Sequence, residues 1–83
     1  MTDKNSSYMS LADLASGAQA IVREVGGGKT LASRLAAMGL VVGSRLEILQ
    51  NPHHGPLLIR VRDTRIALGR GEALRVLAEE VAG

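Results

Sequence analysis

The glycine-rich segment Gly26-Gly27-Gly28-Lys29-Thr30 is the pattern in this sequence that comes nearest to a catalytic motif. It lies between an expected strand and an expected helix, and it looks like the end of a phosphate-binding loop. Such a loop needs a glycine five residues before the glycine of its Gly-Lys-Thr, so that backbone N–H groups can surround a phosphate. That position is Arg23. The sequence therefore argues against nucleotide hydrolysis and leaves only a weak attraction for anions at a helix N-terminus.

The two histidines, His53 and His54, are the strongest candidates for metal ligands. Adjacent residues of an extended segment point in opposite directions, so the pair is poorly placed to chelate one ion. Further ligands would have to come from scattered carboxylates, because the chain has no cysteine. We therefore expect two exposed turn histidines that contact a transition metal only adventitiously, with no resident metal and no cofactor.

Other catalytic arrangements are equally weak in this sequence. No serine lies in a nucleophile-elbow pattern, and the carboxylates are not paired at any recognisable spacing. A domain of 83 residues also has little room for a cleft that excludes water. We expect a protein that is not an enzyme.

The arginines Arg60, Arg62 and Arg65 form the most concentrated group of charged side chains. A net charge of +2 does not by itself argue for nucleic acid. Small barrels that bind single strands also need aromatic side chains for stacking, and the one aromatic residue is Tyr8, outside the expected barrel. We expect these arginines, together with the loop of His53 and His54, to contact a protein partner. The alternatives are an ordinary solvated face, a surface for single-stranded nucleic acid and a generic protein-interaction module.

The first half of the chain predicts one strand and one clear helix. Residues 1–9 read as a disordered tail, followed by a single domain over 10–83. Ser10 is a suitable N-cap for a helical turn over 11–14, and residues 20–25 alternate as a strand. Thr30 is then the expected N-cap of a helix over 31–38, with Gly39 as a left-handed C-cap. The aliphatic stripe of this helix and the residue after its cap are expected in the core: Leu31, Leu35, Met38 and Leu40.

The second half of the chain changes to a period of two residues. Alternation predicts strands over 45–48, 57–62, 65–68 and 74–77, with Asp63-Thr64 as a two-residue hairpin turn. Five short strands, with a helix inserted between the first and the second, predict a mainly β fold: a small SH3-like barrel. Its core must be aliphatic, because the chain contains no Phe and no Trp.

Hydropathy indicates a cytoplasmic protein that is not embedded in a membrane. The longest apolar run, Leu35 to Val42, is far shorter than the roughly 20 residues that span a bilayer. The first ten residues are polar and lack the apolar stretch of a signal peptide. Edge strands of a small barrel would allow a homodimer without requiring one.

Four segments of the chain, in this order and spacing, resemble the FeoA family. They extend from about Ser10 to Leu77, nearly the whole expected domain. Two positions depart from the family's usual pattern: Val42 stands before Gly43 where the family commonly has proline, and Asp63-Thr64 stands where it often has glycine. The matching segments are Ser10-Leu11-Ala12-Asp13-Leu14 with Gly17, Arg34-Leu35-Ala36-Ala37-Met38-Gly39-Leu40 with Gly43, Gly55-Pro56-Leu57-Leu58-Ile59-Arg60-Val61, and Ile66-Ala67-Leu68-Gly69-Arg70 with Ala73.

The resemblance implies a role in bacterial ferrous iron uptake. Members of the family have an SH3-like barrel and accompany FeoB, the membrane permease for ferrous iron that carries a cytoplasmic GTPase domain. The implied role is to bind that permease and to support or regulate transport, without chemistry of its own. Reversing the charge of Arg60 and Arg62 is then expected to weaken permease binding without unfolding the barrel.

Overall fold

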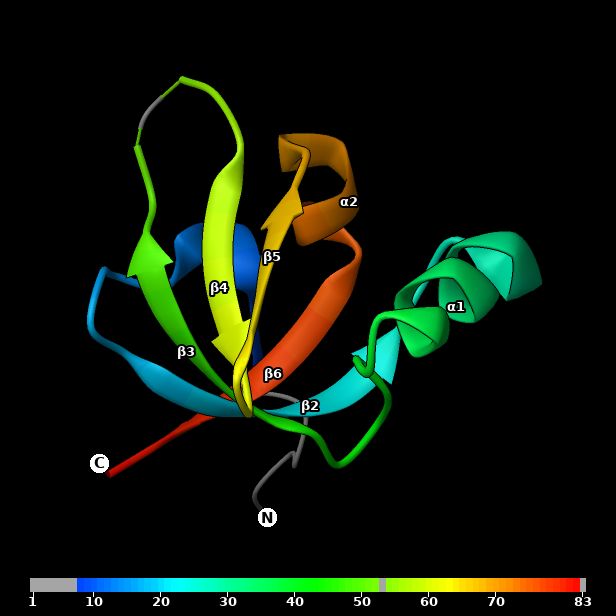
Figure 1. Ribbon diagram of the computed structural model, residues 1–83, viewed down its shortest axis with the longest axis horizontal. Coiled ribbons are helices and arrows are strands. Elements are labelled where there is room, and N and C mark those ends of the chain that lie inside the picture. The colour runs from blue at the N-terminus through cyan, green and yellow to red at the C-terminus, as the bar shows by residue number, and fades with distance from the viewer. Residues whose placement is uncertain (1–7, 53, 83) are drawn as a thin grey trace, which may run out of the picture.

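A computed structural model describes residues 8–52 and 54–82 as one antiparallel sheet with a helix at its side (Figure 1). The strand order across the six-stranded sheet is β1-β6-β2-β3-β4-β5. Figure 1 shows the sheet curled into a half-open barrel, with α1 projecting beside it. The elements are β1 (Tyr8–Ser10), the 3-10 helix η2 (Leu11–Asp13), β2 (Gln19–Val25), α1 (Gly28–Ala37), β3 (Arg45–Gln50), β4 (Leu57–Val61), β5 (Thr64–Leu68), α2 (Arg70–Leu74) and β6 (Val76–Val81).

The alternation of apolar residues produces the two faces of the sheet. In β4, Leu57, Ile59 and Val61 are buried, while the residues between them face outward. The core contains only aliphatic side chains and alanines, in agreement with the composition of the sequence. The mainly β architecture, with a helix between the first two of the expected strands, is confirmed.

The strand count is six rather than five, because a strand forms where the sequence predicted part of the tail. Residues 1–7 lie outside the described residues, whereas Tyr8 and Met9 pair with β6, Tyr8 opposite Glu79. Three residues are too few to show a period, so this strand has no sequence signal of its own. The described barrel therefore begins at Tyr8 rather than at Ser10.

The segment predicted as a strand over 74–77 is divided between two elements. Leu74 is the last residue of the short helix α2, and the strand β6 begins at Val76. The Glu72 side chain accepts a hydrogen bond from the backbone N–H of Gly69 (3.0 Å) and so supports the first turn of α2. A helix of five residues is too short to produce a helical period, which is why the alternation alone was misleading.

The helix α1 begins at Gly28, three residues before the predicted start, and its N-cap is Gly27 rather than Thr30. Gly27 has φ +85°, and a Cβ at this position would lie 2.9 Å from a methyl group of Leu31. Only glycine allows both the conformation and the close approach.

The C-terminus of α1 is as predicted. Gly39 has φ +91°, and its N–H donates to the carbonyl oxygen of Ala36 (2.9 Å). The N–H of Leu40 donates to the carbonyl oxygen of Leu35 (2.9 Å), which completes a Schellman motif. Leu35 and Leu40 are buried as expected, but Met38 is exposed, so its expected place in the core is wrong. Met38 is the C-cap residue, after the last residue of α1, so it does not continue the buried stripe of the helix.

Candidate functional site

A row of polar side chains crosses the outer face of the sheet in strand register. Gln19 of β2 lies opposite Glu47 of β3, and Glu47 lies opposite Arg60 of β4. Arg60 in turn lies opposite Arg65 of β5. Because directly opposite residues share one face of a sheet, these four side chains point outward together.

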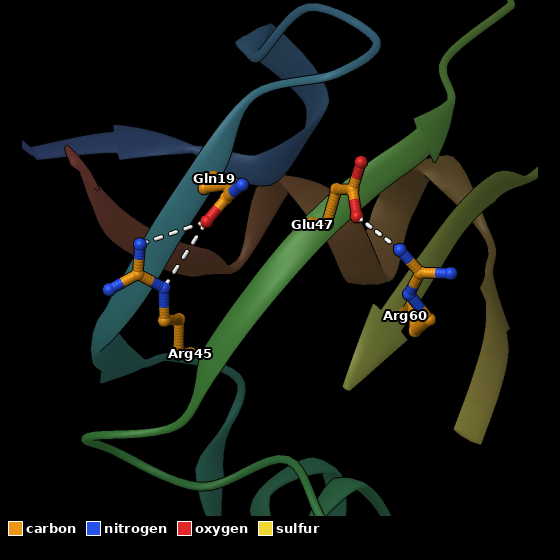
Figure 2. Close-up of polar contacts among 4 residues, drawn as sticks. All are labelled: Gln19, Arg45, Glu47 and Arg60. Carbon is orange, nitrogen blue, oxygen red and sulfur yellow. Dashed lines mark hydrogen bonds and ion pairs between the residues drawn. The ribbon is translucent and has the colours of Figure 1, made fainter. Parts of the chain in front are cut away.

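Two contacts within this row hold the side chains in place (Figure 2). Arg60 Nη2 donates to Glu47 Oε1 at 2.6 Å, so this arginine is paired with a carboxylate. Arg45 lies two residues before Glu47 in β3, and it donates from Nε and Nη2 to Gln19 Oε1 (3.3 and 2.8 Å). It also donates to the carbonyl oxygen of Ala82 (3.2 Å). Its hydrogen bonds in the described structure therefore go to neutral acceptors, which leave its charge in place.

The three predicted arginines lie near one another, but one of them is paired with a carboxylate of the described chain and the other two are not. Arg60 is neutralised by Glu47, whereas Arg62 and Arg65 form no ion pair with any described residue. Arg62 and Asp63 form the two-residue turn of the β4–β5 hairpin, since Val61 pairs with Thr64. The predicted turn, Asp63-Thr64, was displaced by one residue. Arg62 has φ 57°, the single left-handed non-glycine residue in the described chain.

The predicted histidine loop lies at the other end of β4. His54 precedes this strand, is exposed, and is separated from Arg62 by the whole strand, roughly 16 Å at about 3.3 Å per residue. His53 lies outside the described residues. The structure therefore does not bring His54 together with the arginines. Among residues 8–52 and 54–82, no three of the His, Asp and Glu side chains are grouped closely enough to hold a metal ion.

Arg70 and Asn51 fix the end of the barrel next to this loop. Arg70 donates to the carbonyl oxygen of Pro52 (2.7 Å), to Asn51 Oδ1 (2.9 Å) and, with longer bonds, to the carbonyl oxygens of Ala12 and Gly55. Asn51 Nδ2 donates to the carbonyl oxygens of Ala12 (3.0 Å) and Leu14 (2.6 Å). These bonds join α2, η2 and the β3–β4 loop. This arginine has a structural role that its sequence position did not reveal.

The glycine-rich segment is also a packing feature. The N–H of Gly26 donates to the carbonyl oxygen of Arg75 (2.7 Å) and so is not available to an anion. Lys29 and Thr30 lie within the first turn of α1. The structure thus assigns this segment to the junction between β2, α1 and the residue before β6.

A groove beside α1 is a surface feature that the sequence did not predict. It lies between the helix and the loop 40–43, has a volume of about 410 Å³, and is lined by Ala32, Ala36, Val41 and Val42 together with their neighbours. Val41 and Val42 are 47% and 61% exposed, which is unusual for two consecutive valines in a domain with so small a core. We name this hollow the α1 groove. The sequence signal that could have indicated their exposure is their position in a turn, between Gly39 and Gly43.

Two further hollows lie between the α1 groove and the tip of the β4–β5 hairpin. One is lined by Met38, Val61, Arg62 and Thr64 among others, and the other by Ser44, Arg45 and again Arg62. Val41 lines all three hollows. Figure 1 shows the hairpin tip and the loop after α1 at the same end of the barrel.

The loop that presents the two valines is held in place by hydrogen bonds. Ser44 Oγ accepts from the N–H of Val41 (3.0 Å) and donates to the carbonyl oxygen of Gly39 (3.2 Å). The N–H of Gly43 donates to the carbonyl oxygen of Val22 in β2 (2.8 Å). The valines are therefore exposed on a loop that is fixed to the sheet.

None of the described helices is long and apolar enough to cross a membrane. A family model described as the FeoA domain matches residues 9–80. A Methanocaldococcus jannaschii protein named Fe(2+) transport protein A is 34% identical over 64 residues, which cover 77% of each chain.

Solved structures agree with this match and with the SH3-like class. The crystal structure of an iron uptake regulatory protein (FeoA) is 31% identical, covers 89% of this chain and 99% of its own, and superposes with a TM-score of 0.84. Stenotrophomonas maltophilia FeoA, solved with zinc and described as a procaryotic SH3 domain protein, is 32% identical, with 86% and 89% coverage and a TM-score of 0.71. A manganese-dependent transcriptional repressor shares only the fold, at 17% identity over 42% of its chain and a TM-score of 0.81. Matched over residues 9–80 in sequence, and over most of its length in structure, this chain belongs to the FeoA domain family.

Proposed function

We propose that this protein is a non-catalytic cytoplasmic accessory of ferrous iron uptake that binds a FeoB-type permease through the permease's cytoplasmic GTPase domain. The observation that carries the proposal is the FeoA family match over residues 9–80. Two relatives support it: the Methanocaldococcus jannaschii protein is named for Fe(2+) transport, and the Stenotrophomonas maltophilia protein is proposed to be a ferrous iron transport activating factor.

The charged surface supports binding rather than chemistry. We define the arginine face as Arg60, Arg62 and Arg65, and we propose it as part of the contact with the permease. Arg62 and Arg65 form no ion pair with a described carboxylate, so their charges are available to a partner. Exposed cations that are complementary to an acidic partner speed association and set its orientation.

Single-stranded nucleic acid is the rival ligand for the same cations. Its recognition depends on stacking of bases on aromatic side chains, and Tyr8, the one aromatic residue of the chain, lies in β1 at the opposite edge of the sheet from β5. A basic surface without such platforms gives only weak, salt-dependent binding.

Titration of the labelled protein against the cognate permease in nanodiscs, with and without a GTP analogue, tests the proposal. We expect saturable binding to the permease and, at most, weak and salt-sensitive binding to a single-stranded oligonucleotide. A dependence on the GTP analogue would place the effect within the GTPase cycle. Binding to the oligonucleotide alone, in every nucleotide state of the permease, would refute the proposed function.

A double variant tests the arginine face. Arg62→Asp with Arg65→Glu reverses two unpaired cations, and it leaves Arg60 in place because Glu47 needs that partner. We expect about a tenfold loss of permease affinity, a change of about 1.4 kcal/mol. Unchanged affinity in the folded double variant would exclude this surface while leaving permease binding itself intact.

A further inference from the structure

The three hollows at the α1 end of the barrel form one surface of defined chemistry. The α1 groove is lined by aliphatic side chains and alanines with a single serine, and Val41 connects it to the two hollows beside the hairpin tip. Exposed aliphatic side chains gathered in a concave site are typical of a surface that a ligand covers.

The ionisable side chains that line these three hollows are positive. Arg45 and Arg62 also line a fourth hollow, whose carboxylate, Glu47, is paired with Arg60. Among the residues that line the three hollows, Arg45 and Arg62 carry the ionisable side chains, and no Asp or Glu is among them. Arg45 uses neutral acceptors, Gln19 and the carbonyl oxygen of Ala82, and Arg62 has no described ion-pair partner. An occupant that brings carboxylates to this end of the groove would therefore meet two cations that form no ion pair with a described residue.

The surface is also formed in advance. The hydrogen bonds of Ser44 and Gly43 fix the loop that carries Val41 and Val42. The Schellman motif at Gly39 fixes the end of α1. Little conformational freedom is lost when a ligand covers such a site, which favours specific binding.

From these three observations we propose that the α1 groove, with Arg45 and Arg62 at its end, binds a short acidic segment of the partner protein that inserts an aliphatic side chain against Val41 and Val42. The inference rests on the proposed function and names the chemistry of the contact. It moves the centre of the contact from the outer face of β4 and β5 to the end of the barrel, with Arg62 common to both.

The concave shape favours a peptide over a lipid surface. A protein that binds a membrane surface through an amphipathic helix buries one apolar helix face in it, whereas Val41 and Val42 lie on a loop and line a hollow with Ala32 and Ala36. A volume of about 410 Å³ accommodates side chains of a bound segment.

The first experiment measures binding of single variants to the permease in nanodiscs. Val42→Asp places a charge in the groove, and Leu74→Asp is its matched control, because Leu74 is 58% exposed on α2 and lines none of the three hollows. Arg62→Asp reverses a cation at the groove and keeps a residue type that tolerates a positive φ. Arg65→Glu is the comparison on the outer face of β5.

We expect Val42→Asp and Arg62→Asp to weaken binding about tenfold or more, while Leu74→Asp leaves it unchanged and Arg65→Glu has a smaller effect. Full affinity of the folded Val42→Asp variant, beside a wild type that binds, would overturn the groove and leave the proposed function standing. Equal losses in Arg65→Glu and Arg62→Asp, with none in Val42→Asp, would assign the contact to the outer face instead.

The second experiment does not depend on the permease. The isotope-labelled protein is titrated with a short synthetic peptide that carries leucines flanked by glutamates, and with the same peptide carrying lysines in place of the glutamates. We expect the acidic peptide to shift the amide resonances of Val41, Val42 and Arg62, and the basic peptide to bind at least about tenfold more weakly. If neither peptide shifts these resonances, or both bind equally, the proposal is wrong. If the wild type fails to bind the permease, the proposed function fails alone, and these peptides still decide the chemistry of the groove.

Discussion

The two ends of the barrel each present an arginine, and the two arginines serve different purposes. At the end that carries the β3–β4 loop, Arg70 donates to backbone carbonyl oxygens of that loop and of η2 and to the Asn51 side chain. At the hairpin end, Arg62 lies in a strained turn, with no described ion-pair partner and exposed valines nearby. One end uses its polar groups to close the fold, and the other leaves charge and aliphatic surface available.

In a small barrel, the hydrogen-bond partners of each arginine therefore distinguish a structural role from a functional one. An arginine whose donors are satisfied by backbone carbonyls contributes to folding. An arginine held in an unfavourable backbone conformation without a structural partner indicates a role outside the fold. Four experiments test this contrast.

Gly27→Ala should have the largest effect, because it disturbs the junction between β2, α1 and the residue before β6. The added Cβ would lie 2.9 Å from Leu31 and 3.1 Å from Arg75, at a φ of +85°. We expect a loss of about 3 kcal/mol in the free energy of unfolding, from crowding and from the left-handed conformation together. Gly28→Ala is the matched control, because its φ is +78° with no atom within 4 Å, and it should lose only about 1 kcal/mol. Equal losses in urea titrations of the two variants would show that crowding at Gly27 is unimportant.

Arg70→Ala should lower the free energy of unfolding by about 2 kcal/mol, since carbonyl oxygens of the β3–β4 loop and of η2 lose a charged donor. For a domain of this size the melting temperature should fall by roughly 10 °C. Differential scanning calorimetry measures it. Arg70→Lys should recover only part of the loss, because an ammonium group cannot span the same acceptors. A melting temperature within about 2 °C of the wild type would contradict the structural role of Arg70.

Arg62→Asn should raise the stability by about 0.5 kcal/mol and lower the affinity for the partner at the same time. Asparagine adopts a positive φ more readily than arginine does, so the turn loses strain. The same variant removes one of the two cations at the α1 groove. Urea denaturation and permease binding, measured on one preparation, should therefore change in opposite directions. A gain or loss in both would show that the strain is unrelated to binding.

The ion pair between Arg34 of α1 and Glu72 of α2 should contribute least. The Arg34 side chain is 59% exposed, and exposed pairs are typically worth about 0.5 kcal/mol. A double-mutant cycle with Arg34→Gln and Glu72→Gln measures the coupling energy by denaturant titration. A coupling above about 1.5 kcal/mol would contradict the small contribution expected of an exposed pair.

Periodicity predicted the regular parts of the fold. The alternating strands between 45 and 68 and the C-terminus of α1 appeared within two residues of their predicted bounds, because each is long enough to show its period. β1 and α2 were missed, since three and five residues carry no periodic signal. The start of α1 was displaced because its N-cap is a left-handed glycine without a side-chain cap, and the space for a Cβ there is taken by Leu31 and by Arg75, which lies far along the chain.

The site was less predictable than the fold, because its properties depend on pairing across strands. Sequence grouped Arg60 with Arg62 and Arg65, but only the register shows that Glu47 neutralises Arg60. Arg45 was not predicted, because its link to Arg62 at the hairpin tip arises from a hollow that both side chains line. Turn residues such as Val41 and Val42 give no periodic signal that distinguishes burial from exposure.

The pairing of β1 with β6 brings the beginning and the end of the described chain together. Tyr8 lies opposite Glu79, and β6 ends two residues later at Val81. A domain whose two ends lie on neighbouring strands can be inserted into a surface loop of another protein. Short linkers suffice, because the insertion points in the host need not be moved apart. The same geometry allows the ends to be joined and the chain reopened elsewhere, so a circularly permuted barrel with new ends in the β3–β4 loop would present α1 and its groove unchanged.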